Sequence, residues 1–268
     1  MGRKKRRTAA NSDKYDLYEL SVQEPEADCD VVEQVWKEIR GRKPVHMRED
    51  FCATAITAIE WVKRGGRNTA VAIDLDPTVL ELAGERIKAR LKPAQRKRIE
   101  LIEANVLTVE IEPVDCILAT NFSYYIFKTR QRMKKYFKRV HKALVGDGLF
   151  ILDAYGGSDS FLEMEESREC DGFDFIWDQK HYNPITGDVI NHIHFDFPNG
   201  SKMKSAFVYE WRLWTIPELR EMLKESGFQG VTVYWEGTDK DGEGNGEWSP
   251  SKVGEACEGW VAYLVAEK

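Results

Sequence analysis

One stretch of the sequence, residues 45–76, constrains the fold more than any other. It has the pattern of a short strand, a tight turn, a helix over 54–64 and a second strand that leads to Asp74. A strand that turns directly into a helix aims main-chain N–H groups at whatever lies above the turn, and an acid about 20 residues further on can reach a ribose. The stretch therefore predicts a pocket for a nucleotide-like ligand.

The rest of the chain alternates strands and helices around this stretch. Apolar residues recur at helical spacing over 30–40, 79–91 and 130–144, and a capping box of Thr215 and Glu218 predicts a further helix. Further strands are expected over 99–103, 114–120, 149–153, 231–235 and 260–266. We therefore expect an α/β fold, a Rossmann-like seven-stranded mixed sheet with helices on both faces.

The hydrophobic period changes after the fifth of these strands. Three segments then alternate apolar and polar residues in the manner of antiparallel strands, over 173–182, 188–197 and 203–211. Asn199 and Gly200 between the last two form a strong hairpin signal. A three-stranded meander cannot bury both of its faces alone, so it should cover another part of the protein. We expect one domain over 15–268, with 156–212 inserted as an antiparallel β lid.

Composition limits the partners. The chain has no run of about 18 apolar residues, and its five cysteines form no C-x-x-C pair, which argues against a membrane span, a disulfide framework and a zinc site. The net charge is −6 although residues 3–7 are all basic, so the remainder is more acidic still. We expect a cytoplasmic protein with a disordered basic tail over 1–14. This tail is the one expected contact with nucleic acid, a weak one, and a nuclear address is its alternative interpretation.

The turn of the first stretch narrows the choice of ligand. Residues 50–60 contain no glycine. A dinucleotide requires glycines here because its pyrophosphate approaches the main chain closely, whereas S-adenosylmethionine has an aminoacyl group and no phosphate. The glycine-free turn therefore disfavours a dehydrogenase more than a methyltransferase.

Residues 48–55, R-E-D-F-C-A-T-A, carry a resemblance to a known family. From residue 15 onward the chain resembles class I S-adenosylmethionine-dependent methyltransferases, and it is most similar to a group whose first motif reads R-E-D-F-C-G-T-A. The wider superfamily has an acid, one residue and then G-x-G-x-G. Glu49 takes the place of the acid, while Phe51, Ala53 and Ala55 take the three glycine places. A methyl group at Ala53 would weaken cofactor binding if that position needs a positive φ.

The resemblance implies S-adenosylmethionine as cofactor and a set of residues around it. Asp74 stands where an acid accepts from the ribose hydroxyls, and Asn105 stands where an acid commonly binds the adenine amine. The N-terminal segment with Tyr18 folds over the cofactor in related enzymes. The cofactor contacts that we expect are Tyr18, Glu49, Phe51, Cys52, Ala53, Asp74, Leu75, Asn105, Val106 and Asn121.

Methyl transfer is an in-line displacement, so the protein mainly aligns the two reactants and excludes water. Residues 121–125, N-F-S-Y-Y, line the transfer site in this fold and lack the N-P-P-Y form associated with methylation of bases or glutamine amides. His192 and His194 face one side of a strand, where they can be a base and its partner, half of a metal site, or simply surface or packed histidines, which is the slightly favoured interpretation. No Cys, Asp or Glu near them completes a metal set, so no metal is expected. The catalytic candidates are Tyr125, His192 and His194, and the substrate candidates are Asp153, Tyr155, Trp211 and Arg212.

The sequence thus favours a methyltransferase that acts on an oxygen or nitrogen atom of a small or medium-sized molecule. Two alternatives stay open. A non-catalytic protein that binds S-adenosylmethionine or another nucleotide agrees with the loss of all three glycines, and an NAD(P)-dependent oxidoreductase is disfavoured by the same turn. The sequence leaves the identity of the acceptor and the oligomeric state undetermined.

Overall fold

The computed structural model describes residues 6–240 and 244–268, and its centre is a mixed sheet of eight strands. The strands lie in the order β11-β10-β12-β5-β4-β1-β2-β3, in which β3, β2, β1, β4 and β5 pair in parallel, whereas β12, β10 and β11 join the sheet through antiparallel pairs. They are β1 (His46–Asp50), β2 (Thr69–Asp74), β3 (Ile99–Glu103), β4 (Val114–Ala119), β5 (Leu144–Gly156), β10 (Gly230–Thr238), β11 (Gly244–Ser251) and β12 (Trp260–Glu267). The expected doubly wound architecture is confirmed.

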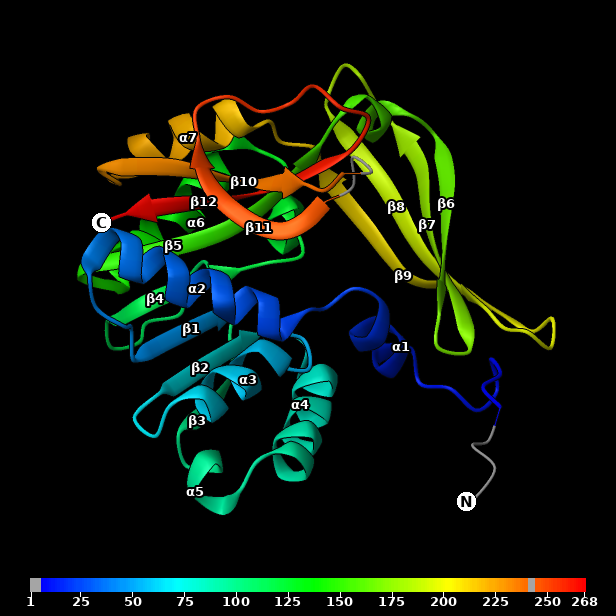
Figure 1. Cartoon of the computed structure of the whole chain (residues 1–268), viewed down its shortest axis with the longest axis horizontal. Helices are drawn as coiled ribbons and strands as arrows, with labels where there is room; N and C mark the ends of the chain where they lie inside the picture. Colours follow the sequence, from blue (N-terminus) through cyan, green and yellow to red (C-terminus); the bar gives the residue numbers. More distant parts are fainter. Residues whose placement is uncertain (1–5, 241–243) are drawn as a thin grey trace.

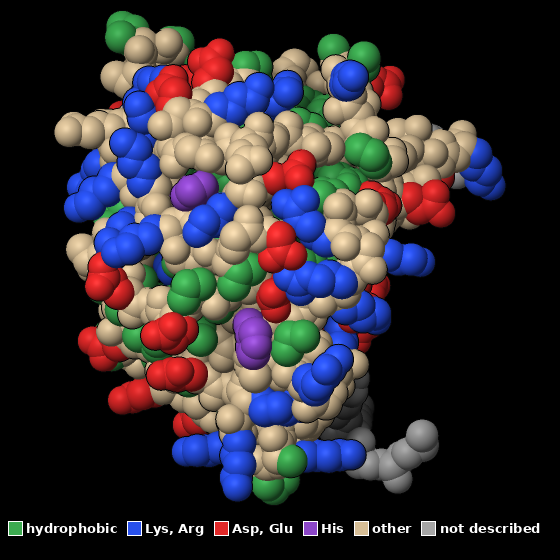
Figure 2. Space-filling view, turned by 90° about the vertical axis from the view of Figure 1, so that its left-hand side faces the viewer, with side chains coloured by type: hydrophobic (Ala, Val, Ile, Leu, Met, Phe, Trp, Pro, Cys, Tyr) green, Lys and Arg blue, Asp and Glu red, His purple; other side chains and the backbone are tan. Residues whose placement is uncertain are grey.

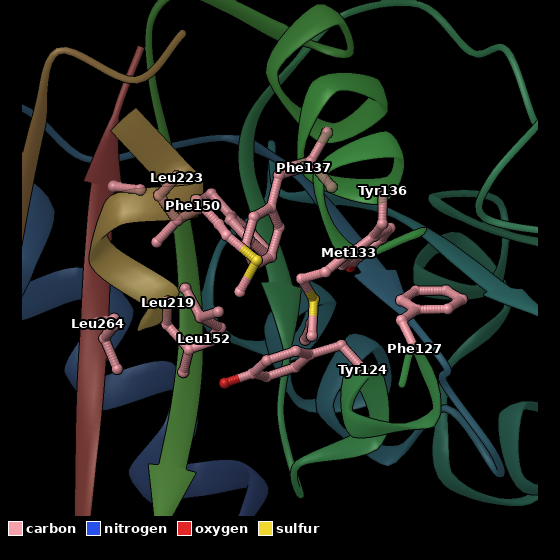
Figure 3. Close-up of a cluster of buried hydrophobic side chains, with 14 of the residues drawn as sticks. Tyr124, Phe127, Met133, Tyr136, Phe137, Phe150, Leu152, Leu219, Leu223 and Leu264 are labelled. Atoms are coloured by element: carbon pink, nitrogen blue, oxygen red, sulfur yellow. The ribbon is translucent and has the colours of Figure 1, made fainter. Parts of the chain in front are cut away.

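Helices cover both faces of this sheet (Figure 1). They are α2 (Pro25–Arg40), α3 (Ile56–Arg64) and α4 (Pro77–Arg90) on one face, and α6 (Arg130–Lys142) and α7 (Ile216–Glu225) on the other. Two short helices, α5 (Pro93–Arg96) and the 3-10 turn η1 (Ser123–Ile126), lie in connections. Figure 3 shows how α6 and α7 pack Phe137, Met133 and Leu219 against Phe150 and Leu152 of β5.

The local signals explain where the helices begin. The Asp76 carboxylate accepts from the amide of Thr78, and with Pro77 as the first helical residue it caps α4. Thr215 and Glu218 form the predicted capping box of α7, with reciprocal side-chain and main-chain hydrogen bonds. Such caps satisfy amides that the first helical turn leaves without an intrahelical partner.

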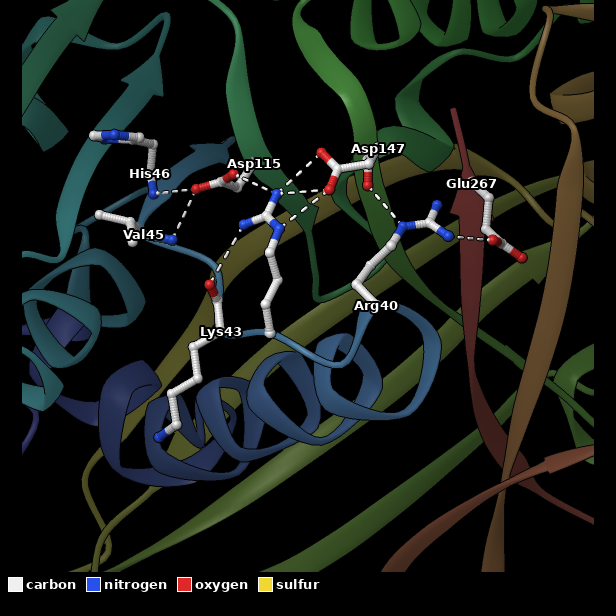
Figure 4. Close-up of polar contacts among 8 residues, drawn as sticks. Arg40, Lys43, Val45, His46, Asp115, Asp147 and Glu267 are labelled. Carbon is white, nitrogen blue, oxygen red and sulfur yellow. Dashed lines mark hydrogen bonds and ion pairs between the residues drawn. The ribbon is translucent and has the colours of Figure 1, made fainter.

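The amino ends of the parallel strands are held by a buried acid, Asp115 at the start of β4. Its carboxylate accepts from the amides of Val45 and His46, at 2.8 and 2.9 Å, and from Arg42 (Figure 4). Figure 2 shows this side of the molecule, where basic and acidic side chains alternate. The carboxyl ends of the strands, where α/β folds bind ligands, point the other way.

A second, antiparallel sheet stands beside the carboxyl ends of the main sheet (Figure 1). Its order is β6-β7-β8-β9, and its strands are β6 (Met164–Cys170), β7 (Phe173–Tyr182), β8 (Asp188–Asp196) and β9 (Lys202–Arg212), preceded by the turn η2 (Ser158–Phe161). The expected three strands are present, but the meander has a fourth. Polar residues over 163–169 hide the period of β6, which pairs with β7 at the edge of the sheet.

The count of seven strands in the main sheet was also too low by one. Strand β11 begins at Gly244, within the glycine-rich segment 241–246; residues 241–243 lie outside the described residues. Strand β11 pairs with the edge of β10, and glycine, proline and serine make its sequence atypical of a strand. None of the helices in the described ranges is long and apolar enough to cross a bilayer.

The N-terminal segment lies between the two sheets (Figure 1). Helix α1 (Lys14–Ser21) packs the rings of Tyr15 and Tyr18 on Phe207 of β9, with centroids 5.5 and 4.9 Å apart. Part of the expected disordered tail also contacts this sheet, since Arg7 lies over the ring of Phe173; residues 1–5 lie outside the described residues. The position of α1 makes it a cover for whatever the strand ends bind.

Candidate functional site

The motif in β1 divides its side chains between the two faces of the sheet. Arg48 and Asp50 point to the side of α6, where Arg48 Nε donates to Asp50 at 2.6 Å and the Tyr136 hydroxyl donates to the same carboxylate at 2.8 Å. All three side chains are buried. The ion pair and the phenol hold the last residue of β1, and with it the start of the following turn, against α6.

Glu49 points to the opposite face and holds the helix after the turn. Its carboxylate accepts from the amide of Ala58, in the first turn of α3, at 2.8 Å. Burial raises the pKa of Glu49 to about 8, although this hydrogen bond opposes the shift. Glu49 therefore holds the turn in place indirectly, through its hydrogen bond to α3.

The turn itself keeps a glycine-like conformation without any glycine. Phe51, Ala53 and Ala55 have φ values of 56°, 47° and 58°, in the left-handed region that favours glycine. The Phe51 ring packs against Tyr136 and Phe127, with centroids 5.7 and 6.0 Å away. The surrounding contacts thus impose a conformation that costs about 1 kcal/mol or more at each non-glycine residue.

Asp74 closes the turn from the neighbouring strand. Its carboxylate accepts from the amides of Ala53, Leu75 and Asp76, at 2.9, 2.7 and 3.1 Å. The Leu75 side chain beside it is 64% exposed, an unusual state for leucine and one that an aromatic ring could cover. The structure thus places this acid at the end of β2, directly against the turn.

One polar atom of the turn supports a bound cofactor. The Thr54 side chain is buried, yet its hydroxyl has no hydrogen-bond partner among the described residues. Buried hydroxyls are normally paired, and the aminoacyl group of S-adenosylmethionine offers both a donor and an acceptor. The exposed Leu75, the accepting Asp74 and the unpaired Thr54 together fit that cofactor.

The remaining expected cofactor residues lie around this turn with different exposure. Asn105 is exposed after β3, and its side-chain oxygen accepts from the amide of Leu107 at 2.9 Å, which leaves its amide group free for a ligand. Val106 is buried, as is Cys52, whose amide donates to the carbonyl of Ile73 in β2. Val106 and Cys52 therefore support the site as buried packing residues.

A second strained turn follows β4, where the transfer site was expected. Asn121 and Phe122 both have a φ of 56°. Their amides donate to the two oxygens of Asp153, at 2.6 and 2.9 Å. Burial raises the pKa of Asp153 to about 8, while these hydrogen bonds lower it. Asp153 thus lies beneath the turn and holds it, and it is buried away from a bound acceptor.

A cavity of about 370 Å³ opens between this turn, α1 and the second sheet. Four residues that the sequence singled out border it, namely Tyr18, Asn121, Tyr155 and Trp211. Phe122, from the segment 121–125 that was expected to line the transfer site, borders it too, whereas sequence reasoning missed Glu24, Glu166, Arg168, Phe175, Trp177 and Tyr209. Phe175, Trp177, Tyr209 and Trp211 follow the strand alternation of β7 and β9, and that period was the available signal.

The catalytic candidates do not meet in this cavity. Tyr125 is fully buried, stacks on Tyr155 and donates to the carbonyl of Trp214, so it supports the wall. His192 and His194 alternate with Ile193, which borders the cavity, so both lie on the outer face of the second sheet. Arg212, a substrate candidate, lies over the ring of Trp214 and pairs with Glu218 of α7, outside the cavity.

Helix α1 borders the cavity and lies near the end of β2. The pKa of Tyr15 is raised by burial and by the charges of Asp76, Asp13 and Asp74. Burial also raises the pKa of Tyr18, on the cavity side, to about 12. Glu19 of α1 binds Arg86 of α4 at 2.9 Å and also pairs with Arg90.

Comparisons with known proteins agree with this geometry. Residues 51–152 match the family model described as a methyltransferase domain. No curated protein sequence matches the chain.

Three solved structures show how far the similarity of fold extends. An S-adenosylmethionine-dependent methyltransferase from Clostridium acetobutylicum ATCC 824 is 18% identical, with a TM-score of 0.69 over 94% of this chain and 96% of that one. CalS10, an amino pentose methyltransferase from Micromonospora echinaspora with its cofactor bound, is 13% identical, with a TM-score of 0.67 over 96% and 97%. KedS8, a sugar N-methyltransferase from Streptoalloteichus sp ATCC 53650, is 15% identical, with a TM-score of 0.64 over 100% and 98%. Residues 51–152 thus resemble a methyltransferase domain, and over nearly its whole length the chain has a fold similar to that of S-adenosylmethionine-dependent methyltransferases.

Proposed function

We propose that this protein transfers the methyl group of S-adenosylmethionine to an amino group of a small molecule bound in the aromatic cavity. The observation that carries the proposal is the cavity itself. It lies against the turn of Asn121 and Phe122, and its volume of about 370 Å³ suits one sugar-sized or similar acceptor.

The turns after β1 and β2 supply the cofactor site. Asp74 would accept from the ribose hydroxyls, and Leu75 would cover one face of the adenine. The main-chain amides of the turn and the Thr54 hydroxyl would bind the aminoacyl group. The cofactor supplies an electrophilic methyl group on a sulfonium ion, and the protein needs only to bring a nucleophile in line with it.

The cavity walls favour a basic acceptor over a neutral hydroxyl. Tyr18, Trp177, Tyr209 and Trp211 present aromatic rings, and rings of this kind attract cations and their alkylated products. Glu24 and Glu166 are the carboxylates among the residues that border the cavity, and either can accept the proton that an ammonium group releases before attack. CalS10 and KedS8, whose folds are similar, are named for an amino pentose and for sugar N-methylation.

A non-catalytic binding protein is the second candidate. The strained turn favours it, because Phe51, Ala53 and Ala55 adopt positive φ values that would be cheaper with glycine. Such a protein would bind the cofactor and its demethylated product without ever methylating an acceptor.

Calorimetry and a turnover assay test both candidates. We expect saturable binding of S-adenosylmethionine and of its demethylated product, but no binding of NAD(P)H. Amino sugars and their hydroxyl analogues, each incubated with the cofactor, should show methylation of the amine alone by mass spectrometry. Methylation of the hydroxyl series alone would overturn the assignment to nitrogen, and cofactor binding without any methylation across a broad acceptor panel would favour the non-catalytic candidate.

The cavity is tested by one pair of variants. Trp177→Leu removes a cavity wall, whereas Trp248→Leu changes a tryptophan of β11 that packs on Tyr263, away from the cavity. We expect the first variant to raise the acceptor KM at least tenfold and the second to leave it unchanged. Equal effects would place the acceptor elsewhere.

A further inference from the structure

The outer face of the second sheet gathers three side chains that can bind a metal ion. His192 and His194 lie two residues apart on β8, and Asp178 of β7 is the cross-strand partner of His192. One ligand atom from each of the three lies within 4.8 Å of the other two. The sequence indicated the two histidines but not the carboxylate, because Asp178 comes from another strand.

The separations are close to those of a metal site. A tetrahedral zinc ion with bonds of about 2.0–2.1 Å holds its ligand atoms about 3.3 Å apart. The distance from Asp178 Oδ2 to His194 Nε2 is 3.2 Å, and the distance to His192 Nδ1 is 3.9 Å. Asp178 and His194 are buried, whereas His192 is partly exposed, so solvent reaches the side where a fourth ligand would bind.

The hydrogen bond at the second ring nitrogen of His194 must change when a metal ion binds. Its Nδ1 accepts from the amide of Ser205 at 2.7 Å, so the proton of the neutral ring is on Nε2 and points at Asp178. A metal ion at Nε2 would require the proton to move to Nδ1, where it would face the Ser205 amide. Binding of a metal ion would therefore replace this arrangement of hydrogen bonds by another.

The backbone conformation at Ser205 allows the hydrogen bond to His194 Nδ1 to be exchanged. It has a φ of 47°, and the pairing of β8 with β9 shifts register between Ile193 and Phe195, so Ser205 lies beside a β-bulge. A rotation of the Lys204–Ser205 peptide by about 180° would turn the Lys204 carbonyl towards His194 Nδ1 and move Ser205 out of the left-handed region. One rotation would thus supply the acceptor that a metal-bound His194 needs and relieve the strain.

We propose that Asp178, His192 and His194 bind a divalent transition-metal ion, with Zn²⁺ as the best match for two imidazoles and one carboxylate. The fourth ligand is a water molecule on the solvent side of His192. The ion joins β7 to β8 on the face opposite the acceptor cavity, so it stiffens the lid and does not take part in methyl transfer. This inference is independent of the proposed function.

Titration of the metal-free full chain with Co²⁺ and Zn²⁺ tests the site. Co²⁺ should give one equivalent of binding with the strong visible absorption of four-coordinate cobalt, and Zn²⁺ should displace it and raise the Tm. Asp178→Asn keeps the shape of the side chain, and we expect it to weaken Zn²⁺ binding at least tenfold and to abolish the metal-dependent rise in Tm.

His181→Ala is the matched control, because His181 lies on β7 like Asp178 but is exposed and pairs with Glu163, which precedes β6. It should leave the titration unchanged. Ser205→Gly removes the cost of the positive φ in the metal-free state, and should therefore weaken metal binding modestly without abolishing it. If wild-type protein shows no saturable binding, or if Asp178→Asn binds as tightly as wild type while both remain folded by circular dichroism, the cluster is a hydrogen-bond network only and the proposal fails.

Discussion

The main-chain amide of Ala53 donates to the carboxylate of Asp74 at 2.9 Å, and this hydrogen bond ties the turn after β1 to the end of β2. The acid assigned to the ribose thus also holds the turn assigned to the aminoacyl group. The two halves of the cofactor site are therefore built as one unit, and a change at either residue should affect both.

Substitutions at Asp74 and at the neighbouring Asp76 distinguish the roles of these two acids. Asp74→Ala removes the acceptor of three amides as well as the ribose ligand, so we expect no measurable binding of S-adenosylmethionine by calorimetry. Asp76→Ala is the control, because it removes only the cap of α4 and should cost about 1 kcal/mol of stability with cofactor affinity retained. Unchanged affinity in Asp74→Ala would show that the ribose site is elsewhere.

Glycine at position 53 should stabilise the folded protein. Ala53 has a φ of 47°, and Ala53→Gly removes a left-handed strain of about 1–2 kcal/mol while adding about 0.5–1 kcal/mol of chain entropy to the unfolded state. We expect a net gain in the free energy of unfolding of up to about 1 kcal/mol, read from urea denaturation. A loss of stability would mean that the Ala53 methyl group makes contacts worth more than the strain.

Phe51 is the contrasting position in the same turn. It too has a positive φ, but its ring packs between Tyr136 and Phe127. Phe51→Gly should therefore destabilise the protein by about 3 kcal/mol, because the lost packing exceeds the strain that is relieved. Stabilisation by this change would contradict the packing role of the ring.

Much of the fold was predictable because its signals are local. The buried parallel strands and the capping box at Thr215 each depend on a few neighbouring residues, and the structure confirms them. The strands β6 and β11 were missed because they lie at sheet edges, where pairing and not apolar alternation defines them.

The site was predictable only in part, because its geometry depends on contacts between distant residues. The sequence left open whether position 53 needs a positive φ, and the structure gives Ala53 a positive φ. The buried state of Tyr125 and the pairing of Asp178 with His192 arise from how strands pack, and no sequence spacing reports them. The role of Asp153 changed for the same reason, from an acceptor contact to the support of the Asn121 turn.

The free energy of unfolding should fall as pH rises, because two buried acids have raised pKa values. Burial raises the pKa of Glu49 from 4.5 and of Asp153 from 3.8, in both cases to about 8. Between those values the folded state holds protons that the unfolded state has lost, so the free energy of unfolding decreases as pH increases. We expect the Tm to drop from pH 5 to pH 8, and to drop less in Glu49→Gln, which keeps an acceptor for Ala58. A Tm that rises over this range in wild type would contradict both shifts.

Asp153 should act on catalysis through position. Asp153→Asn leaves one oxygen for two amides and turns an N–H group towards the other, so the turn of Asn121 and Phe122 should shift. We expect kcat to fall by about 10²-fold with little change in the affinity for S-adenosylmethionine. Loss of cofactor binding instead would make Asp153 a cofactor residue, and an unchanged kcat would mean that the turn does not position the reactants.

The closure of α1 depends on an ion pair that can be removed without touching either ligand. Arg86 of α4 holds Glu19 at 2.9 Å, and the Glu19 side chain is only 7% exposed, so this pair is better shielded from water than a surface salt bridge. Arg86→Ala should loosen α1 and weaken the binding of both cofactor and acceptor, with an increase of about tenfold in each KM. Lys88→Ala on the same helix changes an exposed cation and serves as the control for lost charge. Because α1 contacts both sites, a change in only one of the two constants would show that the helix covers that site alone.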